Sequence, residues 1–169
     1  MKEITIAELG ENMVTAISKE WMLVTAGSVE SWNTMTASWG GIGFLWNRPV
    51  AFVFVRPERY THGFVECCER FTLSFLGDAH RDILNFCGSH SGRDCDKAAA
   101  TGLRPLATPD GCVMFEQARL TLQCRKLYRS EMQAAEFLDP KCLERWYGPG
   151  EGQSLHTVYV AEIEHIYTR

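Results

Sequence analysis

The feature that most constrains the fold is a series of about seven strand-like runs that do not alternate regularly with helices. These runs are rich in β-branched and aromatic residues, and Gly, Asn and Pro bound them. They cover residues 21–26, 34–39, 50–56, 71–76, 112–115, 119–129 and 157–167. Because parallel α/β sheets alternate strands with helices, the pattern predicts a mainly β fold with short helices, built as an antiparallel barrel.

Short helices are expected between the strands, over residues 61–68, 78–86, 91–101 and 139–147. Thr61 is the expected N-cap of the first helix. Gly88 and Gly102 are placed just beyond the second and third helices, where a left-handed residue often ends a helix. The pair Asp139-Pro140 is typical of an N-cap followed by the first helical residue.

Length and charge limit the class of protein. A chain of 169 residues with ordinary globular composition is expected to form one domain over residues 1–169. The net charge of −4 argues against a general surface for nucleic acid or for an anionic membrane. Neither an apolar signal region nor a run of about 18 apolar residues occurs. Seven cysteines without paired CxxC spacing are typical of reduced thiols, so we expect a cytoplasmic protein.

The segment from Asn33 to Ser38 carries small polar residues on an expected strand. Alternation places Thr34, Thr36 and Ser38 on one face, and Met35 and Ala37 on the other. Three hydroxyls along one face can bond the carbonyls and nitrogens of a flat ligand, and their small size permits close approach. A solvated edge strand, with Thr present for its β propensity, explains the same residues.

Two further segments offer seats for an anion. Arg56 and Arg59 lie close to the expected helix start at Thr61, where backbone N–H groups and a guanidinium both favour a phosphate. They can equally be surface arginines paired with nearby glutamates. Ser89, Ser91 and Arg93 lie in a Ser/Gly-rich loop that enters the third expected helix, and Lys97 follows one turn later. This second segment can equally be a capped loop with charges that face solvent.

No metal site is expected. Cys87 and His90 have a spacing that zinc permits, but a second pair of ligands is lacking. The glycines of residues 40–43 do not form a dinucleotide fingerprint, and no phosphate-binding GxxxxGK[ST] motif occurs. His156 stands just before the last expected strand, where it is either functional or simply exposed.

These segments together resemble the flavin reductase-like family of FMN-binding split barrels, and above all its flavoredoxin-like branch. The similar segments follow in order through most of the chain, at residues 21–27, 33–39, 46–49, 56–61, 71–75, 85–89, 91–94, 96–97, 115–116 and 156–163. The resemblance implies a homodimer of Greek-key-like split β-barrels. Each subunit would bind FMN non-covalently near the subunit contact.

The resemblance also implies roles for individual residues. The residues that would line the isoalloxazine ring are Asn33, Thr34, Met35, Thr36, Ala37 and Ser38. Those that would contact the phosphate and ribityl chain are Arg56, Arg59, Tyr60, Thr61, Ser89, Ser91, Arg93 and Lys97. In related reductases the histidine before the last strand lies near the nicotinamide, so His156 is the catalytic candidate.

The resulting hypothesis is an FMN-dependent oxidoreductase of the NAD(P)H:flavin reductase type. It would pass electrons from a nicotinamide to flavin and on to an acceptor, such as free flavin or a partner monooxygenase. His156 would orient the nicotinamide or supply a proton. An FMN-binding electron-transfer protein without a nicotinamide site is the alternative, and a split barrel with a degraded pocket is a second one.

Overall fold

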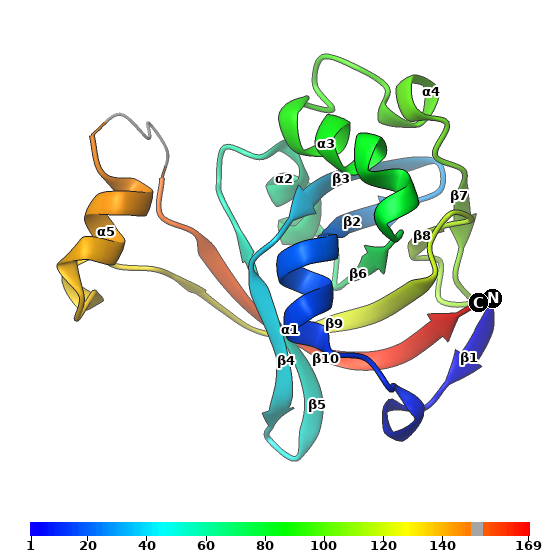
Figure 1. Ribbon diagram of the computed structural model, residues 1–169, viewed down its shortest axis with the longest axis horizontal. Helices are drawn as coiled ribbons and strands as arrows, with labels where there is room; N and C mark the ends of the chain where they lie inside the picture. The colour runs from blue at the N-terminus through cyan, green and yellow to red at the C-terminus, as the bar shows by residue number, and fades with distance from the viewer. Residues whose placement is uncertain (150–153) are drawn as a thin grey trace.

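The computed structural model describes residues 1–149 and 154–169. An antiparallel sheet curves around the core, with its strands in the order β3-β2-β6-β9-β10-β5-β4 and with β1 paired to β10 (Figure 1). The strands are β1 Lys2–Ile4, β2 Met22–Ser28, β3 Ser31–Ala37, β4 Gly40–Leu45, β5 Arg48–Val55, β6 Arg70–Phe75, β9 Leu120–Glu131 and β10 Thr157–Thr168. β7 Pro105–Ala107 and β8 Val113–Phe115 form a separate pair. The predicted mainly β, antiparallel fold is confirmed.

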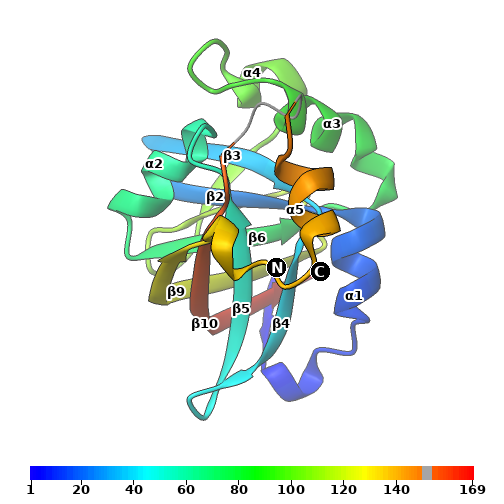
Figure 2. The same ribbon diagram turned by 90° about the vertical axis from the view of Figure 1, so that its left-hand side faces the viewer.

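Short helices cover the sheet and its ends. They are α1 Met13–Thr15, which continues into a π-helical turn Ala16–Glu20, α2 Tyr60–Cys67, α3 Arg81–Ser89, α4 Lys97–Thr101 and α5 Pro140–Tyr147. Single 3-10 turns occur at Ile6–Glu8, Asp78–His80 and Ala134–Glu136. α2, α3 and α4 gather at one end of the barrel, beside β2 and β3 (Figures 1 and 2). No helix among the described residues is both long and apolar enough to cross a membrane.

Two predicted helix boundaries were wrong. α2 begins at Tyr60 with Arg59 as its N-cap, because the hydroxyl of Thr61 is buried and accepts a hydrogen bond from Asn33 Nδ2 at 2.7 Å. Gly88 lies inside α3 rather than beyond it. A Cβ at Gly88 would lie 3.4 Å from Cβ of Thr36, so glycine lets α3 pack closely on β3.

The third predicted helix starts later than expected, while its end and the fourth helix are confirmed. Asp96, and not Ser91, caps α4, because its carboxylate accepts from the backbone N–H of Ala99 at 3.1 Å. Gly102 ends α4 in the left-handed conformation, as predicted. Asp139 caps α5 by accepting from the N–H of Lys141, and Gly148 follows the helix.

β4 is a strand that the sequence did not predict. Its glycines disfavour strand structure by propensity, yet the segment pairs along its whole length with β5. At Gly40, φ is +151° and an added Cβ would lie 2.8 Å from the carbonyl oxygen of Phe52. The two backbones therefore approach more closely than a side chain at this position permits.

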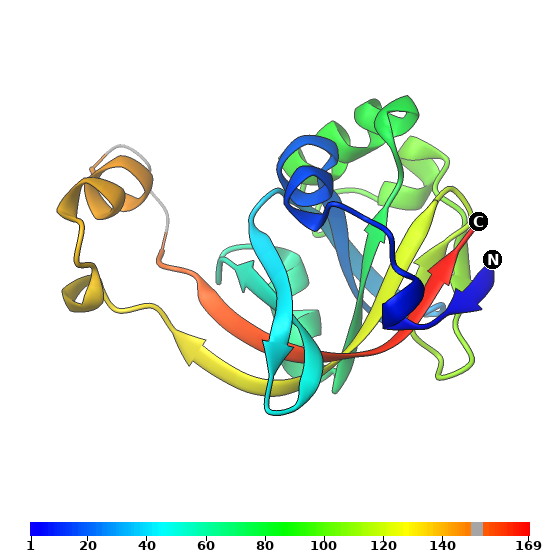
Figure 3. The ribbon, with the colours of Figure 1, turned by 60° about the horizontal axis from the view of Figure 1, so that its bottom comes forward.

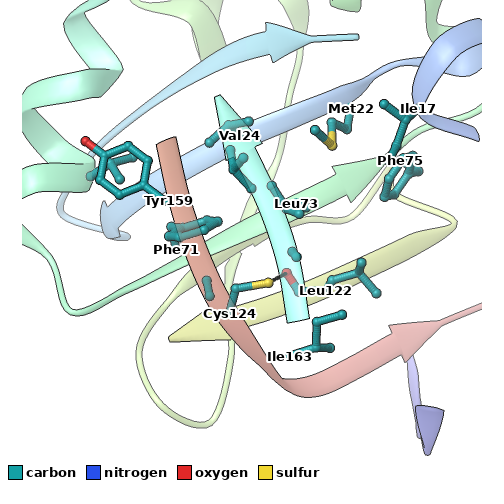
Figure 4. Packing of buried hydrophobic residues seen from close by; sticks show 14 of the residues in the cluster. Ile17, Met22, Val24, Phe71, Leu73, Phe75, Leu122, Cys124, Tyr159 and Ile163 are labelled. Carbon is teal, nitrogen blue, oxygen red and sulfur yellow. Dashed lines mark hydrogen bonds between the residues drawn. The ribbon is translucent and has the colours of Figure 1, made fainter. Parts of the chain in front are cut away.

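The core lies inside the curved sheet, where side chains from most of the strands meet (Figure 4). Phe71, Leu122 and Tyr159 are among the largest fully buried side chains. A second cluster, around Leu84 and Phe115, lies where α3 packs on the outer side of β2. Burial of one such side chain contributes about 1.5–3 kcal/mol, so the second cluster fixes the position of α3 against the barrel.

The segment between β9 and β10 projects away from the barrel and carries α5 near its tip (Figures 1 and 3). We call residues 132–149 the arm. β9 and β10 pair with each other over long stretches, and register shifts at Val160/Ala161 and Ile163/His165 interrupt the ladder. Such irregularities bend a strand and increase its twist.

Candidate functional site

A hollow of about 160 Å³ lies between the start of α2, the end of α3 and the loop that follows α3. It is lined by Asn33, Glu58, Arg59, Tyr60, Thr61, Gly88, Ser89, His90, Ser91, Gly92, Arg93 and Lys97. We call it the basic hollow, because three cationic side chains line it and Glu58 is the one carboxylate among the lining residues. An excess of positive charge in a concave site favours an anionic ligand.

Arg59 is held at the edge of the basic hollow by the end of α3. Its guanidinium donates to the carbonyl oxygens of Gly88 at 2.8 Å and Cys87 at 3.3 Å. Burial lowers the pKa of Arg59, although a guanidinium stays charged at neutral pH. The charge is thus fixed in place before any ligand arrives, which reduces the entropy lost on binding.

Lys97 anchors α4 to the rest of the site. Its side chain is buried, with only 5% of the residue exposed. The ammonium donates to the carbonyl oxygens of Thr34 at 2.7 Å and Cys87 at 2.9 Å. Burial lowers the pKa of Lys97, which makes these two carbonyl partners necessary for the charged form. Lys97 therefore joins α4, β3 and α3 beneath the basic hollow.

The loop after α3 closes the basic hollow against Asn33. A Cβ on Gly92 would lie 1.9 Å from Oδ1 of Asn33, so only glycine fits this contact. Arg93 is exposed, donates to the carbonyl oxygen of Glu58 at 3.2 Å and lies over the Tyr60 ring at 4.8 Å. Arg93 therefore joins the loop to the start of α2, through the Tyr60 ring and through the backbone of Glu58 just before the helix.

Ser89 and Ser91 use their hydroxyls locally, and Ser89, expected in the loop, is the last residue of α3 because the helix runs past Phe86. Ser89 donates to the carbonyl oxygen of Asn85 at 2.8 Å, within α3. Ser91 accepts from the backbone N–H of Arg93 at 3.2 Å. Both residues line the hollow, and their hydroxyl oxygens keep capacity to accept further hydrogen bonds.

A second hollow, also of about 160 Å³, lies beside the basic one. It is lined by Met35, Thr36, Ala37, Ser38, Trp39, Phe54, Arg56, Arg59 and His156. We call it the aromatic hollow, after the rings of Trp39, Phe54 and His156. Arg59 belongs to both linings, so the two hollows are neighbours.

The alternation predicted for β3 agrees with the structure. Met35 is buried in the barrel core and Ala37 packs against it. Thr36 donates to the carbonyl oxygen of Leu84 at 2.5 Å, so its free lone pairs are acceptors toward the aromatic hollow. The hydroxyl of Thr34 is fully buried, 2.7 Å from that of Thr25, and Thr34 lines neither hollow.

His156 lies at the entrance of β10 with 7% of its surface exposed. Its ring centroid is 5.4 Å from that of Trp39 and 6.4 Å from that of Phe54. Burial, assisted by the positive charge of Arg56, lowers the pKa of His156 to about 4. The imidazole is therefore neutral at pH 7. Its Nδ1 lies 2.6 Å from the phenol oxygen of Tyr147.

Arg56 lines the aromatic hollow and not the basic one. Its guanidinium donates to the carbonyl oxygens of Trp146 at 3.1 Å and Ser154 at 3.3 Å, and lies 4.9 Å from the Tyr147 ring. Trp146 in turn meets Trp39 with 5.0 Å between ring centroids. Arg56 thus holds the arm against the barrel instead of lying beside Arg59.

The structure therefore divides the predicted residues, apart from Thr34, between the two hollows, and Arg59 lines both. The basic hollow collects Asn33, Arg59, Tyr60, Thr61, Ser89, Ser91, Arg93 and Lys97. The aromatic hollow collects Met35, Thr36, Ala37, Ser38, Arg56 and His156. Sequence reasoning missed Phe54 and Tyr147. Phe54 belongs to a correctly predicted strand, but nothing in its local pattern indicates a site, and Tyr147 reaches the site only through the placement of the arm.

The family described as Flavin reductase like domain matches residues 14–169. The chain belongs to this flavin reductase-like family. The match spans the whole described site, so both hollows are parts of a flavin reductase-like domain. Comparison with curated protein sequences gives no match.

Solved structures of low sequence identity share the fold of this flavin reductase-like domain. Flavoredoxin from Methanosarcina acetivorans has a TM-score of 0.69 and 20% identity, over 100% of this chain and 76% of the other. An FMN-binding protein from Thermus thermophilus with bound 1-cyclohex-2-enone has 0.67 and 23%, over 88% and 69%. The NADH:FAD oxidoreductase SgcE6 of Streptomyces globisporus C-1027, in complex with NAD and FAD fragments, has 0.65 and 15%, over 89% and 74%. The predicted split barrel is confirmed.

Proposed function

We propose that this chain binds FMN non-covalently and acts as an NAD(P)H-dependent flavin reductase. Electrons would pass from the nicotinamide to flavin and on to an acceptor, such as free flavin or a partner monooxygenase. One observation carries the proposal: Arg59 is shared by a cationic hollow and by an aromatic one. A flavin mononucleotide needs neighbouring seats for a phosphate and for a flat ring. The fold shared with flavoredoxin and the FMN-binding protein supports the same ligand.

The basic hollow fits a phosphate by its donor set. Arg59 and Arg93 supply guanidinium groups, and the first turn of α2 faces the same space. The hydroxyl of Thr61 accepts from Asn33 and is buried, with 1% of the residue exposed, so it is less accessible to a ligand than the guanidinium groups. We therefore assign the main phosphate contact to Arg59 and a secondary, exposed contact to Arg93. Lys97 contributes its positive charge from below.

The aromatic hollow fits a flat ring. Thr36 on β3 and Ser38 just after it offer hydroxyl oxygens, and Trp39 would provide an apolar wall. When bound there, FMN supplies the redox chemistry, because its ring accepts a hydride and passes the electrons on. The neutral imidazole of His156 would hold the nicotinamide by a hydrogen bond. A role of His156 as a cationic acid at pH 7 is disfavoured, since burial lowers its pKa to about 4.

We also propose that two copies of the chain associate through the arm. Leu138 is fully exposed, and it lines an apolar hollow of about 400 Å³ together with Met132, Phe137 and Cys142. An exposed apolar surface on a projecting segment is costly unless another surface covers it. A second copy is the proposed occupant, in keeping with the homodimer that the family resemblance implies.

The test of the reductase function is a visible absorption spectrum of the purified chain with FMN, recorded anaerobically before and after addition of NADH or NADPH. A flavin band that stays with the protein on gel filtration and bleaches with either nucleotide supports a flavin reductase. A bound flavin that only dithionite reduces would replace the proposal with an electron-transfer protein. A chain that retains no flavin and does not alter its spectrum would overturn the proposal entirely.

A further inference from the structure

Half-buried Tyr147 and buried His156 form a pair beside the aromatic hollow, which His156 lines. The phenol oxygen of Tyr147 lies 2.6 Å from Nδ1 of His156, and the two ring centroids are 5.6 Å apart. Tyr147 is the last residue of α5, so the pair joins the arm to the entrance of β10. Burial lowers the pKa of His156 to about 4 and raises the pKa of Tyr147, so both groups are uncharged at pH 7.

The acid and base strengths of the two groups identify Tyr147 as the donor of this hydrogen bond. The phenol oxygen and Nδ1 lie 2.6 Å apart, within hydrogen-bond distance. A phenol is a stronger acid than a neutral imidazole, and the imidazole nitrogen is the stronger base. In the opposite arrangement the phenol proton would be left with the sulfur of Met132 at 3.7 Å, a weak acceptor.

This assignment determines the other nitrogen of His156. A neutral imidazole that accepts at Nδ1 carries its own proton on Nε2. Within residues 1–149 and 154–169, the hydrogen bonds of this side chain end at Tyr147. Nε2 is also absent from the side-chain atoms that are buried without a partner there, which are Gln123 Oε1 and the Tyr167 hydroxyl. Since His156 lines the aromatic hollow, we infer that this N–H is the group it offers to a ligand there.

We propose that Tyr147 is a positioning residue that holds His156 as a hydrogen-bond donor. Its phenol fixes the imidazole in the tautomer with the proton on Nε2, and this N–H points to a carbonyl oxygen of the bound ring system. The inference rests on the proposed function and deepens it. The carbonyl oxygen that accepts this hydrogen bond belongs either to the nicotinamide carboxamide or to the flavin. The experiments below distinguish these two acceptors.

Contacts with Arg56 and Trp39 hold the Tyr147 and His156 side chains in position. Arg56 lies 4.9 Å from the Tyr147 ring and donates to the carbonyl oxygen of Trp146, which holds the end of α5. Trp39 lies beside both Trp146 and the imidazole, with centroid distances of 5.0 Å and 5.4 Å. Tyr147 and the imidazole therefore have little freedom to rotate apart, and the tautomer is set by geometry.

The direct test is the tautomer itself, read by two-bond ¹H–¹⁵N correlation spectra of the ¹⁵N-histidine-labelled full chain with FMN at pH 7. The signals of His156 are identified by their loss in His156→Gln. We expect the wild type to show a protonated Nε2 and a bare Nδ1. Tyr147→Phe should convert this pattern to a mixture of both tautomers, while Tyr128→Phe, an exposed tyrosine outside both hollow linings, should leave it unchanged.

Kinetics with matched variants provide the second test. His156→Gln keeps an N–H near the position of Nε2, whereas His156→Asn keeps one near Nδ1. We expect His156→Asn and Tyr147→Phe to slow flavin reduction by NADH about fivefold to tenfold, the range for one hydrogen bond, and His156→Gln to retain more of the rate. An unchanged FMN dissociation constant in these variants would assign the carbonyl to the nicotinamide, and a raised one to the flavin.

The outcomes separate this inference from the proposed function. A wild-type spectrum with the proton on Nδ1, or a Tyr147→Phe spectrum identical to wild type, overturns the positioning role even if reduction by NADH is fast. The expected tautomer together with a flavin that neither NADH nor NADPH can reduce would sustain the Tyr147–His156 geometry and reject the reductase. Circular dichroism of each variant verifies that the fold is retained, and Tyr147→Phe keeps the ring that packs against Arg56.

Discussion

Arg59 shows how one side chain can serve both the fold and a site. Its guanidinium satisfies two carbonyl oxygens at the end of α3 and still borders both hollows. The last carbonyls of a helix lack partners within the helix, and a cation there is stabilised by the helix dipole. The same bonds place the charge where a phosphate would need it.

Replacement of this arginine should weaken flavin binding. We expect Arg59→Ala to cost about 1.5–3 kcal/mol of FMN binding free energy, the usual range for a charge-assisted hydrogen bond. Arg93→Ala should cost less, because Arg93 is exposed and stacked on Tyr60. Titration calorimetry measures the FMN dissociation constant of both variants. Urea unfolding without FMN measures how much stability Arg59→Ala loses with its bonds to α3. Unchanged affinity in Arg59→Ala would remove this residue from the phosphate site.

The buried histidine should make stability depend on pH. The folded-state pKa of His156 is about 4, below the value of about 6.5 expected in the unfolded chain. Between these values the unfolded state binds more protons, so stability falls as the pH falls through this window. The contribution is absent at pH 7 and approaches a cost of about 3 kcal/mol near pH 4.

Urea unfolding at pH 7, 5.5 and 4.5 checks this prediction in the wild type and in His156→Gln. The free energy of unfolding of the wild type should decrease more steeply with falling pH than that of the variant. Carboxylates with lowered pKa, such as Glu164 between Arg70 and Arg125, lose their stabilisation at lower pH in both proteins. Two parallel pH profiles would contradict the assignment of a buried, neutral imidazole.

At the scale of elements, the site depends on how closely the loop after α3 meets β3. Gly92 contacts Asn33, whose amide nitrogen donates to Thr61 in α2. These contacts fix the positions of the loop, β3 and α2 relative to one another around the basic hollow. A methyl group at position 92 would displace Asn33 from Thr61 and disturb all three elements together.

Gly92→Ala should therefore cost roughly 1–3 kcal/mol of stability, as overpacking usually does, and should also weaken FMN binding. Gly63→Ala is the matched control. Gly63 is exposed in α2 with open space around its Cβ position, so alanine there should stabilise the chain by up to about 1 kcal/mol. Urea unfolding and FMN titration report both quantities. Equal behaviour of the two variants would refute the close contact at Asn33.

The elements differ in how far the sequence can predict them. Strands such as β6 and β10 carry their own signal, because β-branched and aromatic residues suit a half-buried pleated surface. β4 has no such signal. Gly40, Gly41 and Gly43 predict an interruption between strands, and only the pairing with β5 makes this segment a strand. The N-cap of α2 was misplaced by two residues, at Thr61 instead of Arg59, because Thr61, a good N-cap by type, bonds to Asn33 instead.

In the candidate site, too, the sequence predicts the residues that have a local signal and misses those that depend on tertiary contacts. The order of motifs predicted Arg59, Ser91 and β3, since local patterns place them on a helix start, a loop and a strand, whereas Ser89 lies in α3 and not in the loop. Arg56 and Arg59 are indistinguishable in sequence, and the arm decides which of them faces the loop. Tyr147 was not predicted, because its bond to His156 exists only when the arm returns to the barrel.

At the scale of the whole molecule, the arm leaves apolar surface uncovered in a single chain. It projects from the barrel (Figure 3), and its apolar residues include the fully exposed Leu138. The arm also delivers Tyr147 to the aromatic hollow and Trp146 to Trp39. Association of two chains through the arm would therefore cover apolar surface and fix part of the site in the same step.

Leu138→Glu should convert the dimer that we propose into a monomer, because a carboxylate is too costly to bury at an apolar contact. Sedimentation velocity measures the oligomeric state, and a parallel FMN titration reports the site. Leu106→Glu is the control, since Leu106 lies on β7, outside the arm, with 39% of its surface exposed. A wild type that sediments as a monomer would reject association through the arm. A dimer that persists in Leu138→Glu would place the contact on another surface, and weaker FMN binding in the monomeric variant would show that the second chain supports the site.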